Sequence, residues 1–139
     1  LKAIRKLKTL PDVNLCVHLM FGLPDETDAQ IRKTAEILSE QKVDGVKLHN
    51  LHVLRNTPLE KLYRESLFKP VDLEEYSRKV ALFLENLSPN IAVHRLAAVA
   101  SRWDELVAPQ WTREKMKTTQ FIDDFLAAKE TWQGRCFEV

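Results

Sequence analysis

The stretch Asn14-Leu-Cys-Val-His-Leu-Met-Phe-Gly-Leu-Pro-Asp-Glu-Thr27 decides how the rest of this chain is interpreted. Its first part, Asn14–Phe21, is a nearly continuous apolar run that ends in Gly22-Leu23-Pro24. Such a run is typical of a strand buried on both faces, as in a parallel sheet. Asp25 or Thr27 can then cap a helix, whose apolar stripe would be Ile31, Ala35, Ile37 and Leu38. A buried strand followed by a capped helix predicts an α/β unit.

The same alternation continues along the chain. Two further strands are predicted, Val43–Asn50 and Ile91–Leu96, with a loop over Leu51–Thr57. The helices predicted around them are one ending before Pro11, one from Pro58 to about Glu65, one capped by Asp72 and running through Leu87, and a long one from Trp111 that fades near Gly134. Strands that alternate with helices predict parallel βαβ units with right-handed crossovers. Three strands are few for so much helix, which favours part of a larger barrel.

Composition limits the function classes. With 139 residues, 45% of them apolar, one domain with its own core is expected. A formal net charge of +1 gives no argument for nucleic acid or an anionic membrane on charge alone. No apolar run approaches the roughly 20 residues of a membrane span. The first residues, Leu1–Arg5, resemble the end of an earlier helix rather than a signal peptide, so we expect a fragment. The two distant cysteines, Cys16 and Cys136, favour a cytoplasmic, reducing compartment.

The predicted strands carry unusual polar side chains. Because side chains alternate along a strand, His18 shares a face with Met20, Lys47 with His49, and His94 with Leu96. If those faces point into a barrel, three imidazoles and one ammonium converge near its mouth, with His52 and Arg55 on the loop above. Such groups suit binding an anionic substrate or transferring a proton. A histidine metal site is a weaker alternative, because the only close pair, His49-x-x-His52, crosses into a loop.

The segment His18–Thr27 resembles the fifth strand of radical S-adenosylmethionine (SAM) barrels of the Elp3, MiaB and oxygen-independent coproporphyrinogen oxidase type. That strand reads apolar-apolar-x-Gly-Leu/Phe-Pro-Gly-Glu-Thr, so the chain departs from it at Asp25, which leaves the backbone geometry of the loop open. Further segments are similar to the YhcC/YtqA-like branch of Fe-S oxidoreductases, namely Val46–Leu59, Val93–Leu96, Leu106–Trp111 and Lys115. The similarity covers nearly all 139 residues.

The resemblance implies a fold and a site. The fold is an incomplete, TIM-like β/α barrel of about six strands, (β/α)6. Residues 1–139 would form its C-terminal portion, with a helical extension over about 111–133. By resemblance, Met20 and Gly22 would lie against the SAM adenine, and the backbone of His52, Val53 and Leu54 would bond its edge. The residues that would face substrate are His18, Lys47, His49, Arg55, His94 and Arg95. No catalytic residue is assigned.

The cluster motif of the family, Cys-x3-Cys-x2-Cys, has no counterpart here, because Cys16 and Cys136 lie far apart. A [4Fe–4S] cluster needs grouped thiolates, so the chain alone is expected to be inactive, and Cys16 is expected to be a buried free thiol. In the parent enzyme, the cluster and SAM would generate a 5′-deoxyadenosyl radical. The partner of this chain would be the missing N-terminal half-barrel. Without it, strand Asn14–Phe21 would be an open edge that promotes self-association.

The substrate is open. Modification of a tRNA wobble uridine is one role suggested within the family, and Lys47, Arg55, Arg95 and Arg102 would then meet phosphates. The near-zero net charge argues against a basic stripe. The alternative from another class is a non-catalytic α/β interaction module. In it, the tryptophans Trp103, Trp111 and Trp132 would form a partner surface instead of packing the last helix onto the barrel. The coding sequence upstream of Leu1 would separate the two readings.

Overall fold

The computed structural model describes residues 1–100 and 102–138. Its main sheet has three parallel strands in the order β1-β2-β4: β1 (Cys16–Phe21), β2 (Gly45–Asn50) and β4 (Ala92–Arg95). Helix α2 (Asp28–Glu40) connects β1 to β2, and α4 (Leu73–Asn86) leads into β4. The predicted α/β fold, with parallel strands alternating with helices, is confirmed.

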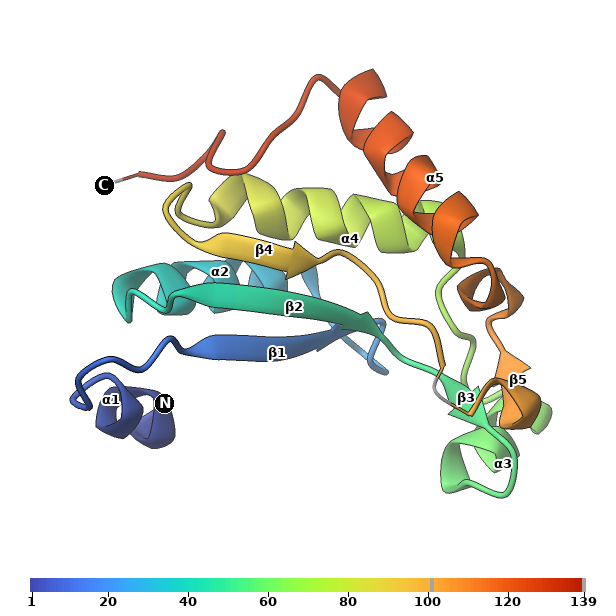
Figure 1. Ribbon diagram of the computed structural model, residues 1–139. Coiled ribbons are helices and arrows are strands. Elements are labelled where there is room, and N and C mark those ends of the chain that lie inside the picture. The colour runs from blue at the N-terminus through green and yellow to red at the C-terminus, as the bar shows by residue number, and fades with distance from the viewer. Residues whose placement is uncertain (101, 139) are drawn as a thin grey trace.

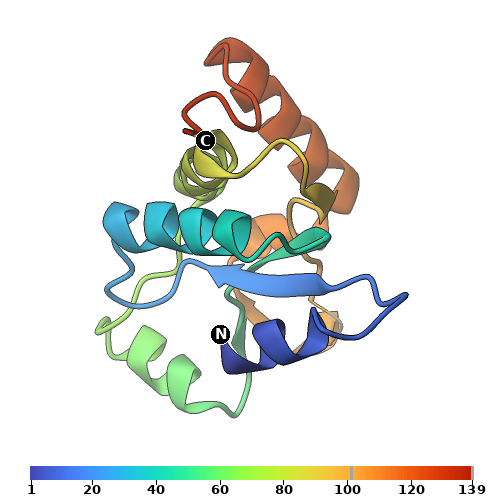
Figure 2. The same cartoon turned by 90° about the vertical axis from the view of Figure 1, so that its left-hand side faces the viewer.

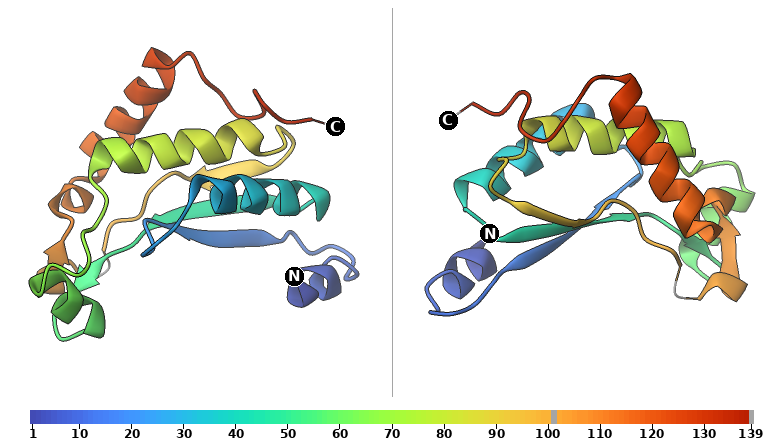
Figure 3. Two further views of the ribbon diagram at one scale, coloured as in Figure 1. Left: turned by 180° about the vertical axis from the view of Figure 1, so that it is seen from behind. Right: turned by 45° about the horizontal axis from the view of Figure 1, so that its top comes forward.

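The two long helices cover one face of this sheet only. Figure 3 shows, from behind, α2 and α4 lying over the strands, and the two helices contact each other. The opposite face is turned toward the viewer in Figure 1, and among the described residues no helix lies across its strands. We call this second surface the open face. Helix α5 (Lys115–Ala128) packs on α4, and α1 (Lys2–Leu7) lies near the amino end of β1 (Figures 1 and 2).

A smaller group of elements lies beyond the carboxyl ends of the strands (Figure 1). It consists of β3 (Val53–Leu54), α3 (Pro58–Arg64) and β5 (Leu106–Ala108). Strands β3 and β5 pair antiparallel, so the prediction of a plain loop over Leu51–Thr57 was wrong. Strands of two and three residues have no periodicity to detect, and they exist only because they pair with each other. The last helix also begins later than predicted, because Gln110–Arg113 forms a 3-10 turn before it.

The structure defines the backbone of the turn between β1 and α2, whose geometry the sequence left open because Asp25 stands where the family pattern has glycine. Thr27, rather than Asp25, caps α2: its hydroxyl accepts from the Gln30 N–H (3.3 Å), and the Gln30 side chain accepts from the Thr27 N–H (2.8 Å). Asp25 has a φ of 58°, the left-handed conformation that glycine adopts freely. Because Asp tolerates this conformation better than most residues, the turn keeps its shape without the glycine of the family pattern.

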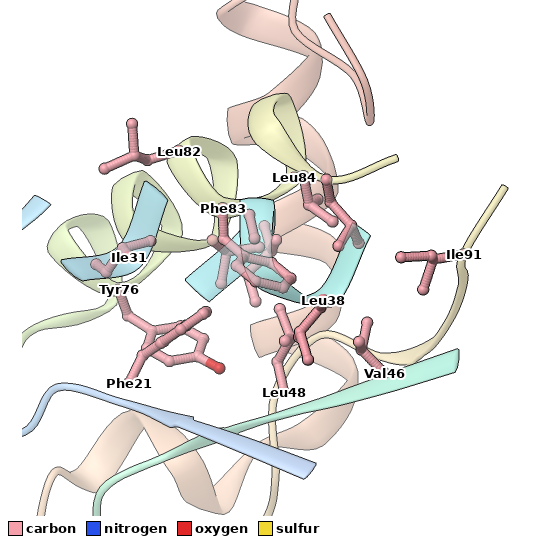
Figure 4. Packing of buried hydrophobic residues seen from close by; sticks show 14 of the residues in the cluster. Phe21, Ile31, Leu38, Val46, Leu48, Tyr76, Leu82, Phe83, Leu84 and Ile91 are labelled. Carbon is pink, nitrogen blue, oxygen red and sulfur yellow. The ribbon is translucent and has the colours of Figure 1, made fainter. Parts of the chain in front are cut away.

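The core lies between the sheet and the two covering helices (Figure 4). Val46 and Leu48 of β2 are fully buried, and Phe21 packs edge-on against Phe83 of α4 with ring centroids 5.3 Å apart. Each such side chain contributes about 1.5–3 kcal/mol relative to exposure. Cys16 is only half-buried, because it lies on the open face; the expectation of a buried thiol was wrong.

Trp111 and Trp132, the two tryptophans with described side chains, have different environments. Trp111 packs on Tyr76 with ring centroids 5.2 Å apart, and its indole N–H donates to the Val71 carbonyl (3.2 Å). Trp132 is 62% exposed, so its expected role in packing the last helix is not observed. The side chain of Trp103 lies outside the described part of the structure. No helix in residues 1–100 and 102–138 has the length and apolar character needed to cross a membrane.

Candidate functional site

The open face gathers the polar residues of the strands. In the parallel register His18 is opposite Lys47, and Met20 is opposite His49. The rings of His18 and His49 stack at a centroid distance of 5.2 Å, which places them on the same face, as the alternation predicts. Met20 is 45% exposed there, whereas Lys47 and His49 are half-buried. The carboxyl-terminal half of the open face is thus both accessible and basic.

An irregularity in β4 adds Arg95 to this face. Ala92 pairs with Gly45 and Val93 with Val46, but the register then shifts so that Arg95 pairs with Lys47. A bulge of this kind places an extra residue on one strand and changes the direction of its side chains. Arg95 Nη2 consequently donates to the ring of His49, 3.2 Å from Nδ1 and closer to Nε2. Simple alternation from Ile91 does not reveal this contact.

His94 lies nearer the amino ends of the strands than the sequence implied. Its ring covers Gly45 at the start of β2, so that a Cβ at position 45 would clash with His94 Nε2. Because β4 pairs only with the first half of β2, His94 does not reach the carboxyl edge near Met20. Glycine at position 45 leaves the space that the imidazole occupies.

The His49 imidazole is a hydrogen-bond acceptor in this arrangement. Partial burial lowers the pKa of His49, and the charges of Arg95, His18, His52 and Lys47 lower it further. A neutral ring is therefore favoured near pH 7, and a neutral imidazole offers one nitrogen lone pair to the Arg95 guanidinium. His49 thereby fixes the position of Arg95.

Gly22 is required by the backbone of the chain itself. It has a φ of 85°, it is buried, and a Cβ there would lie 3.0 Å from Val71 Cγ2. Its N–H donates to Glu26 Oε2 (2.9 Å), and the same oxygen lies 3.4 Å from Lys79 Nζ. Both charged side chains are nearly buried, with 9% and 7% exposure. The Glu of the turn motif thus ties β1 to α4, a role that the sequence analysis missed.

Asn50 is a second residue that the sequence analysis missed. It ends β2 with 1% exposure, its Oδ1 accepts from the Ala98 N–H (2.9 Å), and its Nδ2 contacts His52 Nε2 (2.7 Å). The Tyr76 hydroxyl donates to the Leu96 carbonyl (2.7 Å). These bonds fix the segment that follows β4. An Asn at the end of a strand predicted to be buried was the available signal, since buried amides are nearly always hydrogen-bonded.

The remaining candidates lie beyond the open face. Burial lowers the pKa of His52, whose ring contacts Asn50, and Val53 is buried and pairs with Ala108. The Arg55 N–H donates to the Glu105 carbonyl (2.8 Å), and its side chain is exposed. The pKa of Glu60 is lowered mainly by its hydrogen bond to Arg64 and weakly by the charge of Arg55. Arg55 therefore belongs to the neighbourhood of α3 rather than to the strands.

No metal site is formed within the described residues. No group of three or more His, Cys, Asp or Glu side chains in residues 1–100 and 102–138 could hold an ion. Cys16 lies at the start of β1, whereas Cys136 is exposed in the C-terminal tail. A cluster with grouped thiolate ligands does not fit these residues alone.

Anaerobic reconstitution of this chain with iron and sulfide is accordingly expected to yield no stoichiometric cluster. The reason is the separation of the two thiols. Iron and acid-labile sulfide should be measured after gel filtration, with the Cys16→Ser, Cys136→Ser chain as the control for adventitious iron. About four irons per chain, lost in the control, would contradict the expectation.

Comparisons with known proteins agree with this architecture. The solved structure of Elp3 from Methanocaldococcus infernus, with an N-terminal deletion, superposes with a TM-score of 0.77 at 19% identity, over 95% of this chain and 30% of that one. The chain thus shares the fold of about a third of that Elp3 chain. The chain also matches the Radical_SAM C-terminal domain over residues 43–128. It therefore belongs to the Radical_SAM C-terminal domain family.

Three curated relatives match at similar levels. The uncharacterized protein MJ0486 of Methanocaldococcus jannaschii is 31% identical over 90% of this chain and 39% of its own length. Protein YhcC of Escherichia coli K12 is 31% identical over 82% of this chain and 37% of its own. The uncharacterized protein YtqA of Bacillus subtilis is 28% identical over 91% and 39%. The chain thus spans about two fifths of the relatives' length, and the resemblance to the YhcC/YtqA-like branch is confirmed.

Proposed function

We propose that this chain forms the SAM-adenine-binding and substrate-facing part of a radical SAM enzyme. The observation that carries the proposal is the open face of the sheet, which presents basic side chains although the opposite face is packed by helices. Family membership supports it, because the family is defined by radical SAM proteins. The rest of the barrel, including the cluster ligands, is the proposed partner of the open face, in a cytoplasmic enzyme.

Met20 is the residue we propose for the adenine ring. It is exposed at the carboxyl end of β1, so an aromatic base can pack on its thioether. The adenine edge would meet the β3 backbone at His52–Leu54 on the side away from β5, since β5 occupies the other side. Gly22 would contribute by shaping the turn beneath. When bound, SAM and its cluster supply the radical that abstracts a substrate hydrogen.

The substrate would contact the basic residues of the open face. His18, Lys47 and Arg95 can bind and orient it, and His49 holds Arg95 in place. A tRNA wobble uridine is our candidate substrate within this class, supported by Lys47 and Arg95. Arg55 lies near α3, and Arg102 is exposed and paired with Glu105. Both would therefore contact tRNA outside the open face.

The test compares two activities of the full-length protein. Lys47→Ala and His49→Ala are expected to reduce substrate turnover about 100-fold, because a misplaced substrate loses the proximity contribution. Formation of 5′-deoxyadenosine without substrate should change by less than a factor of about three, since neither residue is proposed to contact SAM. Turnover is measured by nucleoside mass spectrometry on tRNA from cells that lack the protein.

Lys33→Ala is the matched control, because Lys33 is exposed on α2, where it pairs with Glu36. It should leave both activities unchanged. Equal loss of both activities in Lys47→Ala and His49→Ala would mean that these residues support SAM binding or folding. A full-length protein that forms no 5′-deoxyadenosine at all would overturn the proposed function.

A further inference from the structure

Arg95 is a half-buried cation with no carboxylate partner in the described part of the chain. Within residues 1–100 and 102–138, its Nε atom is buried without a hydrogen-bond partner, and its guanidinium contacts the His49 ring. The ion pairs of residues 1–100 and 102–138 include neither Arg95 nor Lys47. Buried charges in proteins are normally paired, so a half-buried guanidinium without a carboxylate partner is unusual.

The strand register places further basic residues beside Arg95. Lys47 and Arg95 are direct neighbours across β2 and β4, and like charges in opposite positions destabilise a strand pair. His18 is opposite Lys47 on the other side, so three basic groups follow one another across the sheet. The sequences of β1, β2 and β4 contain no Asp or Glu that could compensate them.

Two carboxylates near the strand ends, those of Glu26 and Asp44, have other partners. Glu26 bonds Gly22 and Lys79, and Asp44 accepts from the Leu15 N–H (2.7 Å) and pairs with Lys8 (3.2 Å). A concentration of positive charge that is hydrogen-bonded into position, yet unbalanced, is the arrangement that binds an anion.

We propose that Arg95 and Lys47 form an oxyanion site that binds a carboxylate or phosphate group of the substrate. Arg95 would supply two parallel N–H donors to the anion, as its planar fork allows, and Lys47 would add a single charge. His49 is the positioning residue, since it orients the guanidinium through a neutral acceptor nitrogen. The assignment to substrate rests on the proposed function; binding of the oxyanion itself does not.

The test is calorimetric titration of the full-length protein at low ionic strength with two probes, inorganic phosphate and acetate. One or both should bind, and the stronger probe identifies the source of the oxyanion. Arg95→Met should weaken binding at least 10-fold, because it removes the charge and the fork. The anion affinity of Arg95→Lys should lie between those of the unmodified protein and Arg95→Met, since lysine keeps the charge but not the fork. Arg32→Met, on the exposed side of α2, is the matched control and should not change the affinity.

The role of His49 has a separate readout. His49→Ala should weaken anion binding, and His49→Gln should restore most of it, because the Gln carbonyl can accept from Arg95. If His49 has a purely structural role, both variants should lose the same amount of anion affinity, and both should also lose thermal stability. That result would overturn the positioning assignment. Circular dichroism of each variant identifies any that fails to fold, and Arg95→Lys then carries the comparison.

Two outcomes would overturn the proposal and leave the proposed function intact. The first is an absence of phosphate and acetate binding in a protein that cleaves SAM. The second is complete loss of anion binding at saturating SAM, which would assign the oxyanion site to the carboxylate of the cofactor. Anion binding that depends on Arg95 in a protein that does not cleave SAM would support the site and reject the enzyme.

Discussion

Replacing Lys79 by methionine is expected to destabilise the protein by about 3–5 kcal/mol, because it leaves the nearly buried Glu26 carboxylate without its cation. The Lys79 ammonium lies 3.4 Å from Glu26 Oε2, 3.5 Å from the Glu26 carbonyl and 3.8 Å from Glu75. In the variant, the Glu26 carboxylate keeps the hydrogen bond from the Gly22 N–H. Urea unfolding monitored by circular dichroism measures the change. It is a large fraction of the free energy of unfolding of a typical domain, roughly 5–15 kcal/mol.

Two variants complete the experiment. Lys33→Met removes an exposed ion pair with Glu36 and should leave the stability essentially unchanged, because solvent screens such pairs. Adding Glu26→Gln to Lys79→Met should recover part of the loss, since the amide oxygen still accepts from Gly22 and the unpaired charge is gone. A loss below about 1 kcal/mol for Lys79→Met alone would show that water reaches the Glu26 carboxylate.

The chain by itself is expected to self-associate at micromolar concentration through strand β1. Among the described strands, β1 is bonded to β2 only, so its other edge presents free N–H and C=O groups. It contains no proline or lysine, and its only polar side chain is His18. These are the features of an edge strand that pairs with another copy. Light scattering under reducing conditions, which exclude a Cys136 disulfide, measures the mass.

A lysine on the exposed side of the edge should restore the monomer. Met20→Lys places a charge on the open face of β1, whereas a lysine at Val17 would disturb the core that Val17 contacts. Leu67→Lys is the matched control: Leu67 is 72% exposed and lies after α3, so it should leave the association unchanged. A monomer of 16.1 kDa for the unmodified chain would show that its own segments protect the edge.

Local patterns were sufficient for the order of the main helices and strands and for the face on which the residues of β1 and β2 lie. The apolar run before Gly22 predicted a buried strand, and Thr27 and Asp72 do cap the helices that follow. His18 and His49 stack on one face because alternation is a property of each strand alone. The family resemblance added the protein family, which strand and helix periods cannot identify.

What the sequence by itself determined, therefore, is what depends on neighbours along the chain: periodicity, caps and turns. Only the tertiary structure decided the register of β4 on β2, which places Arg95 against His49 and leaves His94 over Gly45. The same is true of the pairing of β3 with β5 and of the Glu26–Lys79 contact between distant segments. A shift of one residue in register turns a side chain to the other face at almost no local cost. The choice is therefore made by packing and pairing across the whole fold.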